Sequence, residues 1–243
     1  MKACILIPIY NNKDTIEAVV AEVRAFSLPI VIVNDGSDAM THTVLDAISG
    51  EDVEVVHLAQ NGGKGMAVKT GLVHAHRKGF THALQIDADG QHRAQDIPKF
   101  LTAAEAEPEA LVLGCPVFSD DVPAARLHGR KLSVWLVWLQ TMSRAIRDPL
   151  FGFRVYPLQA AVGVIDRYLI GNRMDFDPEI AVKLYWVGCP VVNIHSPVRY
   201  PEGGLSSFRM VRDNIRITLM HTRLVLGMIP RLPRLLGRKK PVS

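Results

Sequence analysis

Cysteine is scarce in this chain of 243 residues, where only Cys4, Cys115 and Cys189 occur, each isolated beside apolar residues. Because there is no CxxC pair and no even-numbered framework, a disulfide scaffold or a zinc cage is not expected. Long apolar runs are also missing. The longest charge-free stretch inside the chain lies between Lys183 and Arg199, and it is too short and too polar for a transmembrane span of about 20 residues. These absences favour a protein of a reducing cytoplasm.

Acidic residues almost disappear from the C-terminal part of the chain. From Leu205 onward, nine basic residues are accompanied by one acidic residue, Asp213, whereas acidic residues are in excess over residues 1–204. Because of this asymmetry, we expect a basic tail to meet an anionic partner, either lipid or nucleic acid. The N-terminal stretch MKACILIPIYNN runs directly into a strand-like segment, which predicts no signal peptide.

Two periodicities alternate over the first 114 residues. Apolar runs suited to buried parallel strands occur at residues 3–9, 30–34, 53–58, 83–87 and 111–114. Helix-like segments separate them, at residues 16–26, 37–49, 64–78 and 95–107, and Asp14 and Glu17 have the spacing of a capping box. This alternation predicts an α/β fold with a Rossmann-like, doubly wound and mostly parallel sheet. Ligands bind such sheets beyond the carboxyl ends of the strands.

The second half of the sequence has a mixed pattern. Residues 126–147 have a helical pattern, 148–157 read as a turn-rich connector, and Asp177-Pro178-Glu179 opens another helix with proline in its first position. Residues 205–237 form a long helical stretch that Pro230 and Pro233 are expected to break. Its apolar row is flanked by arginines, which is typical of an amphipathic helix at a membrane interface, although a core-packing helix or a subunit contact has the same pattern. The row consists of Phe208, Val211, Ile215, Leu219 and Thr222.

The strongest chemical signal is the run Asp87-Ala88-Asp89-Gly90-Gln91-His92 at the end of a predicted strand. Two carboxylates two residues apart and a carboxamide offer oxygen ligands to Mg²⁺ or Mn²⁺. Paired carboxylates are costly to bury without a cation, and a cation there could clamp a diphosphate and neutralise a departing phosphate. A solvated acidic turn that caps the next helix is the alternative interpretation.

Two further strand ends carry polar, glycine-rich segments. Asp35, in the run VIVNDGS, can accept hydrogen bonds from a nucleobase or ribose, or can simply form a turn. In the loop Asn61-Gly62-Gly63-Lys64-Gly65, the glycines allow close backbone approach and Lys64 can pair with phosphate, although an ordinary loop has the same pattern. Neither a P-loop nor the GxGxxG of dinucleotide folds is present.

Taken in order, IPIYNN, IVNDGSD, QNGGKGMA and IDADGQH resemble the motifs of family 2 glycosyltransferases, enzymes of the GT-A fold that use nucleotide sugars. The likeness continues through DPLFGFRVY and MDFDPEIAVKLYWVG and covers about residues 1–200. Within the family, DADGQH is most similar to the polyprenyl-phosphate sugar synthases. The resemblance implies donor contacts from Pro8, Tyr10, Glu17, Asp35, Lys64, Asp87 and His92, and metal ligation by Asp87, Asp89 and Gln91.

The chemical class of the acceptor determines which further residues the transfer reaction requires. A hydroxyl acceptor requires a general base, and Glu179 stands where hydroxyl-using relatives carry an acidic residue, although it could equally complement a helix dipole. A phosphate acceptor is already an anion and requires cations to position it. The segment HSPVRYPEGGLSSF resembles the acceptor loop of the lipid-phosphate synthases, which implies acceptor contacts from His195, Arg199 and Ser206. Ser207-Phe208 stands where that loop has a lysine, and Arg199 could instead be a structural ion-pair partner.

These observations favour a GT-A domain over residues 1–204 followed by a basic, amphipathic helical tail over residues 205–243. The expected activity is an inverting, metal-dependent transfer of a sugar from a UDP- or GDP-linked donor to a lipid-linked acceptor at the cytoplasmic face of a membrane. Its expected catalytic residues are Asp89, Arg199 and, for a hydroxyl acceptor, Glu179. Nucleic acid is not an expected partner. Three alternatives stay open: a degenerate GT-A domain that binds anionic lipid or nucleic acid through its tail, a hydroxyl-acceptor glycosyltransferase that uses Glu179 as its base, and a nucleotidyltransferase.

Overall fold

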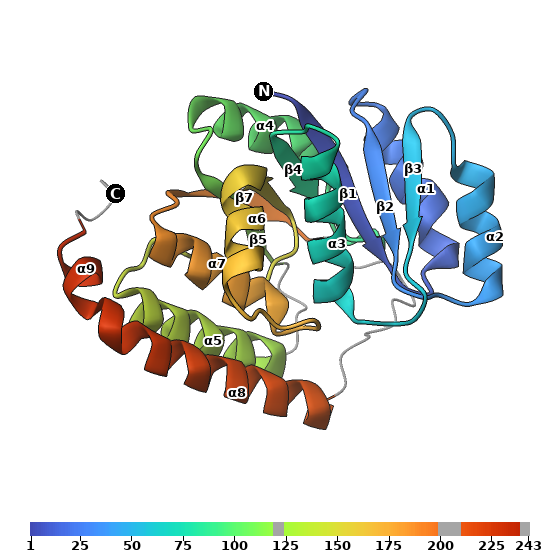
Figure 1. Ribbon diagram of the computed structural model, residues 1–243. Coiled ribbons are helices and arrows are strands. Elements are labelled where there is room, and N and C mark those ends of the chain that lie inside the picture. Colours follow the sequence, from blue (N-terminus) through green and yellow to red (C-terminus); the bar gives the residue numbers. More distant parts are fainter. Residues whose placement is uncertain (119–123, 199–209, 239–243) are drawn as a thin grey trace.

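Seven strands form one mixed sheet in the order β3-β2-β1-β4-β6-β5-β7, in a computed structural model that describes residues 1–118, 124–198 and 210–238 (Figure 1). β6 runs antiparallel to β4 and β5, and the other neighbouring strands are parallel. The carboxyl ends of the parallel strands therefore lie at one edge, which we call the rim. The strands are β1 (Ala3–Ile9), β2 (Ile30–Asn34), β3 (Val53–His57), β4 (His82–Gln85), β5 (Leu111–Val117), β6 (Arg154–Pro157) and β7 (Val191–Pro197).

Helices cover both faces of the sheet (Figure 1). The apolar core on one face takes its helical residues from α1, α2 and α4, and the core on the other face takes them from α3 and from α5 to α9. The apolar strands β1 and β2 are buried along their whole length because both faces are covered. The helices are α1 (Lys13–Arg24), α2 (Ala39–Ile48), α3 (Lys64–Arg77), η1 (Ala94–Asp96), α4 (Ile97–Ala106), α5 (Ala124–Thr141), α6 (Leu158–Arg167), α7 (Phe176–Val187), α8 (Met210–Met228), η2 (Ile229–Arg231) and α9 (Leu232–Leu236).

The C-terminal helices pack into the same core as α7. Met220 of α8 and Leu235 of α9 are buried in that core. Arg238 donates hydrogen bonds to the carbonyl oxygens of Tyr185, Gly188 and Cys189, at the end of α7. The last carbonyls of a helix lack partners within the helix, so this arginine caps α7. The predicted break near Pro230 is confirmed, because α8 ends at Met228, whereas Pro233 lies in the first turn of α9 and does not end that helix.

α5 and α8 lie side by side (Figure 1), and both expose apolar side chains. Trp135 of α5 is 57% exposed, and Ile215 and Leu219 of α8 are each 55% exposed. Ile215 and Leu219 are four residues apart and so share one face of α8. Within the described ranges, no helix is long and apolar enough to cross a membrane.

Three details of the predicted secondary structure are wrong. Residues 148–157 contain strand β6, which the sequence concealed because Arg154, a charged residue, is fully buried in it. α1 begins at Lys13 with Asn12 as its N-cap, so Asp14 lies inside the first turn and the expected capping box is absent. α7 begins at Phe176 after Asp175, so Asp177 is not its cap and proline is not its first residue.

Candidate active site

Asp35, which directly follows β2, holds the glycine-rich loop that precedes α3. Its Oδ1 accepts a hydrogen bond of 2.8 Å from the Gly62 amide, and its Oδ2 accepts one of 2.7 Å from the Gly63 amide. The side chain is almost fully buried. Burial raises the pKa of Asp35, while the two amide hydrogen bonds and the charge of Arg173 oppose the shift. Asp35 therefore fixes the shape of the loop at the rim.

Gly63 occupies a position that only glycine fits. Its φ is +99°, and a Cβ there would lie 2.4 Å from Cγ of Arg173. Arg173 also donates a hydrogen bond of 3.1 Å from Nη1 to Oδ1 of Asn61. The backbone of the loop before α3 thus packs directly against the side chain of Arg173, in the segment before α7. Arg173 was not singled out from the sequence, where its one signal is a basic residue just before MDFDPE.

Lys64, the first residue of α3, lies between two carboxylates from different parts of the chain. Its Nζ is 2.8 Å from Oδ2 of Asp87 and 3.3 Å from Oδ2 of Asp177. Burial by itself lowers the pKa of a lysine, but here the charges of Asp177 and Asp87 outweigh it and raise the pKa of Lys64. The ammonium group is therefore fixed as a cation at the rim.

The segment after β4 carries the two aspartates of DADGQH. Burial tends to raise the pKa of Asp87, yet the positive charge of Lys64 and the contact with His92 outweigh burial and lower it. Nε2 of His92 lies 3.1 Å from Oδ2 of Asp87. The pKa of Asp89 is raised, first by burial and then by the negative charge of Asp87. The hydroxyl of Thr15 in α1 donates a bond of 2.6 Å to the carbonyl of Ala88, which anchors this segment.

The donor chemistry of this segment fits a hard divalent cation. Asp87 and Asp89 supply carboxylate oxygens and Gln91 an amide oxygen, the types that Mg²⁺ and Mn²⁺ prefer. The pKa of Asp89 is raised by burial and then by the negative charge of Asp87, and a cation bound beside both carboxylates would lower it. No group of three or more His, Cys, Asp or Glu residues in the described part of the chain is arranged to hold a metal ion. Beside the two carboxylates, a cation at this segment would need the Gln91 amide oxygen and oxygens from a bound substrate.

Buried polar residues from β6 and β4 support the site from behind. The Arg154 guanidinium donates to the carbonyl oxygens of Phe151, Asp177 and Pro149, at 2.8, 2.7 and 2.6 Å. This fixes the start of α7 and hence the position of Asp177. The Tyr156 hydroxyl donates to Oε1 of Gln85 at 3.1 Å, and Nε2 of Gln85 donates to Oδ1 of Asp87 at 3.3 Å. None of these supporting roles was expected from the sequence.

Glu179 lies one helical turn into α7 and points to a different set of partners. Its Oε1 accepts a bond of 2.8 Å from Lys183, and its Oε2 accepts one of 2.7 Å from the Gly171 amide. Arg223 of α8 lies 3.2 Å from Oε2. The side chain is fully buried. Both oxygens are therefore engaged, and the acidic residue of α7 that reaches the rim is Asp177.

The other expected site residues are more scattered. Pro8 is buried at the end of β1, whereas Tyr10 and Glu17 are exposed. His195 is exposed on β7. Arg199 and Ser206 lie outside the described residues. Val198, the last described residue before them, pairs with His92 in an isolated β-bridge, so the chain leaves β7 beside the DADGQH segment.

Solved structures share this fold. Glucosyl-3-phosphoglycerate synthase from Mycobacterium tuberculosis, in complex with Mn²⁺, uridine-diphosphate-glucose and phosphoglyceric acid, superimposes with a TM-score of 0.63 at 15% identity, over 100% of this chain and 82% of that one. The Staphylococcus aureus protein TarS (residues 1–349), in complex with UDP-GlcNAc, gives 0.64 at 15% identity, over 98% of this chain and 72% of that one. The expected GT-A fold is confirmed.

The family follows from the sequence match. The model of Glycosyl transferase family 2 matches residues 4–161, so the chain belongs to that family, the nucleotide-sugar-dependent transferases that its motifs resemble. The polyprenol monophosphomannose synthase of Mycolicibacterium smegmatis is 25% identical over 228 residues, 88% of this chain and 83% of that protein. The dolichyl-phosphate beta-glucosyltransferase of Drosophila melanogaster is 27% identical over 205 residues, 74% of this chain and 61% of that protein.

Proposed function

We propose that the protein transfers a sugar from a nucleotide-diphosphate donor to a polyprenyl phosphate. The observation that carries this proposal is the contact of Lys64 with Asp87 and Asp177. These three residues come from three of the motifs that resemble the family, and they meet at the rim. The names of the two sequence relatives support a lipid phosphate as acceptor. Both proteins are about one-quarter identical to this chain, so the acceptor is a proposal for this chain rather than a transfer of their names.

The donor is proposed to lie along the rim. Pro8, Tyr10, Glu17 and Asp35 lie toward the base and ribose, Lys64 and His92 lie toward the diphosphate, and Asp87, Asp89 and Gln91 hold Mg²⁺ or Mn²⁺. When bound, the cation neutralises charge on the departing diphosphate. Lys64 adds a second, permanent positive charge beside it. Arg173, which packs against Gly63 of the glycine-rich loop, adds a third positive charge near the loop.

The acceptor phosphate needs no general base, because it is an anion at neutral pH. One of its oxygens attacks the anomeric carbon from the face opposite the leaving group, the bond from that carbon to the diphosphate breaks, and its electron pair leaves with the nucleoside diphosphate. This displacement inverts the anomeric centre. Arg199, Ser206 and His195 are the proposed acceptor contacts. The occupied carboxylate of Glu179 favours this chemistry over a hydroxyl acceptor.

A lipid acceptor requires access to a membrane surface. α5 and α8 expose apolar side chains, and α8 also carries the basic residues Arg212, Arg216 and Arg223. This combination is suited to the interface of a bilayer that contains anionic lipid. The proposed location is the cytoplasmic face of a membrane, with peripheral contact through this surface.

The test is a calorimetric titration of UDP- and GDP-sugars in the presence of Mn²⁺ or Mg²⁺, repeated with chelator. We expect one class of donor to bind with metal and to lose most of its affinity without it. Asp89→Asn should abolish sugar transfer to a polyprenyl phosphate in detergent. Asp46→Asn, a change of the same kind on an exposed position of α2, should leave transfer unchanged. Normal transfer by Asp89→Asn contradicts the metal role, and the absence of donor binding to folded protein contradicts the proposed function.

A further inference from the structure

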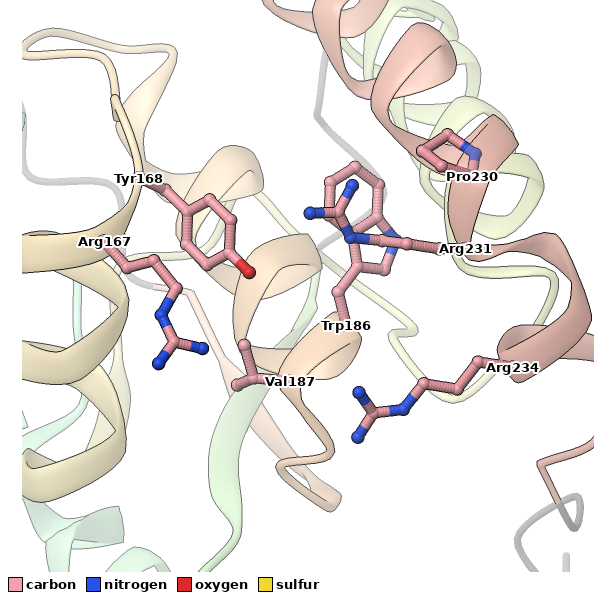
Figure 2. Close-up of a pocket in the computed structure, with 7 residues that line it drawn as sticks. All are labelled: Arg167, Tyr168, Trp186, Val187, Pro230, Arg231 and Arg234. Carbon is pink, nitrogen blue, oxygen red and sulfur yellow. The ribbon is translucent and has the colours of Figure 1, made fainter.

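A cavity of about 480 Å³ lies between the ends of α6 and α7 and the C-terminal elements η2 and α9 (Figure 2). Its wall includes two aromatic rings, Tyr168 and Trp186, and three arginines, Arg167, Arg231 and Arg234. None of its lining residues is acidic, and none belongs to the rim described above. The cavity is therefore separate from the proposed donor site and carries an excess of positive charge.

The arginines reach the cavity from two sides. Arg167 ends α6, whereas Arg231 and Arg234 come from η2 and α9, and Figure 2 shows Arg167 and Arg234 extending from opposite sides of the space. The Arg231 guanidinium stacks over Trp186, 4.7 Å from the ring centroid, and lies 5.7 Å from the centroid of Tyr168. Stacking on a ring holds the guanidinium plane while its N–H edge stays free to bind an anion.

No carboxylate balances these charges within residues 1–118, 124–198 and 210–238. The ion pairs of arginine in these ranges include those of Arg130, Arg154 and Arg223, and none involves an arginine of the cavity. The arginines affect the neighbouring Tyr168. Hydrogen bonding to Arg231, with a smaller effect of Arg167, lowers the pKa of the Tyr168 hydroxyl.

Helix capping does not account for all three arginines. The terminal carbonyls of α7 already accept hydrogen bonds from Arg238, and Arg231 donates from Nη1 to Gly227, at 2.6 Å, and hydrogen-bonds Tyr168. A helix C-terminus carries about half a negative charge, which is less than the charge of three guanidinium groups. Arg167 and Arg234 are exposed, so their N–H groups are open to water or to a ligand in the cavity.

We propose that this cavity binds a phosphate group, as a phosphomonoester or phosphodiester. Guanidinium groups form paired, charge-assisted hydrogen bonds to phosphate oxygens, and three arginines line this cavity. The same chemistry is offered by a soluble phosphorylated molecule and by the headgroup of an anionic lipid. This site is independent of the sugar-transfer site, since its lining residues and those of the rim do not overlap.

Two probes separate the sources. The full chain is titrated in a calorimeter with inorganic phosphate and, separately, with dihexanoyl phosphatidylglycerol below its micelle concentration. We expect one site per chain for at least one probe. Binding of inorganic phosphate alone identifies a soluble ligand, and stronger binding of the phosphatidylglycerol identifies a lipid headgroup. If neither probe binds at millimolar concentration, the proposal is wrong.

The control is a pair of variants with the same loss of charge. Arg167→Gln with Arg234→Gln removes two exposed arginines of the cavity, and Arg77→Gln with Arg147→Gln removes two exposed arginines elsewhere. The first pair should weaken probe binding by about tenfold or more, the second by less than twofold. Equal weakening in both pairs shows attraction to net charge and overturns the site. Binding of the nucleotide sugar should be the same in both pairs, and it also reports that each variant is folded.

Discussion

Asp87 and Asp177 share one cation, since Nζ of Lys64 lies 2.8 Å from the first carboxylate and 3.3 Å from the second. Asp87 follows β4, Asp177 belongs to the first turn of α7, and Lys64 begins α3. One ammonium group therefore joins the sheet to two helices at the rim. Because both carboxylates are mostly buried, this shared positive charge stabilises them together, beside His92 at Asp87 and Arg154 at Asp177.

Replacing Lys64 by methionine removes the shared cation. We expect the free energy of unfolding to fall by about 3 kcal/mol. Without Lys64, Asp87 keeps only its contact with His92, and Asp177 keeps only the Arg154 guanidinium, 3.6 Å away. Lys78→Met is the matched control, since Lys78 is 52% exposed in its ion pair with Glu54, and an exposed pair contributes at most about 1 kcal/mol. Urea denaturation of both variants measures the difference. Equal losses contradict the structural role of Lys64.

Acid should destabilise the protein in part through Asp87. The pKa of Asp87 is lower in the folded protein than in the unfolded chain, where a carboxyl group titrates near about 4. Its contribution to stability is thus complete above that value and is lost as the pH falls through the lower, folded pKa. The pKa values of Asp35 and Asp89 are raised in the folded protein, so these two residues favour the folded state as the pH falls.

The Asp87→Asn variant isolates this effect. Its free energy of unfolding should fall less than that of the unmodified protein as the pH is lowered below about 4. Asp14→Asn changes a carboxylate that is 86% exposed and should leave the pH profile unchanged. If the free energy of unfolding falls with pH equally in the Asp87 variant and in the unmodified protein, the pKa of Asp87 is not lowered by folding.

Glu179→Gln should damage stability far more than catalysis. The change leaves the largely buried Lys183 without its carboxylate partner, which costs about 3 kcal/mol in unfolding free energy. The Gln side chain still accepts the bond from Gly171. Below the melting temperature, kcat should stay within about threefold. A kcat reduced by about a thousandfold in a variant of normal stability would restore Glu179 as a general base.

Gly63→Ala should disrupt the rim through sterics alone. The new methyl group would lie 2.4 Å from Cγ of Arg173 and 2.6 Å from the carbonyl oxygen of Asn172. Gly79 also has a positive φ, of +78°, but a Cβ there meets nothing closer than 3.8 Å. Gly79→Ala should therefore cost only about 1 kcal/mol, and Gly63→Ala should cost more and weaken donor binding. Thermal melting and donor titration compare the two, and equal effects contradict the packing role.

Ile215→Asn with Leu219→Asn should weaken the proposed membrane contact without unfolding the protein, because both side chains are already 55% exposed. We expect about a tenfold loss of binding to vesicles of phosphatidylcholine and phosphatidylglycerol. Met40→Asn, 60% exposed on α2, is the control and should bind like the unmodified protein. Vesicle sedimentation measures binding, and an unchanged affinity of the double variant locates membrane contact elsewhere.

The sequence predicted the rim better than the residues behind it. Strands such as β1 and β2 are continuous apolar runs, and glycines and aspartates mark where they end. β6 was missed because Arg154 and Tyr156 look like surface residues, and their burial depends on carbonyls and side chains contributed by distant segments. Such partners exist only after folding.

The choice between Asp177 and Glu179 shows a second limit. Residues two apart on a helix point about 200° apart, so only one of them can face the rim. Which one does so depends on where the helix begins. The sequence suggested Asp177 as the cap, whereas α7 begins at Phe176 after Asp175. That shift places Asp177 beside Lys64 and turns Glu179 toward Lys183 and α8.

Because β6 runs antiparallel to its neighbours, the chain between β5 and β6 forms one continuous insertion at the rim. β5 ends and β6 begins at the same edge of the sheet, so the segment between Val117 and Arg154 leaves and re-enters at the rim. That excursion includes α5, with its exposed Trp135. An exchange of this segment between related proteins would replace α5 and leave the strands before it unchanged in sequence. Chimeras joined at these two boundaries must keep Gly152, because a Cβ there would lie 2.5 Å from Oδ2 of Asp87 and 2.8 Å from Nζ of Lys64.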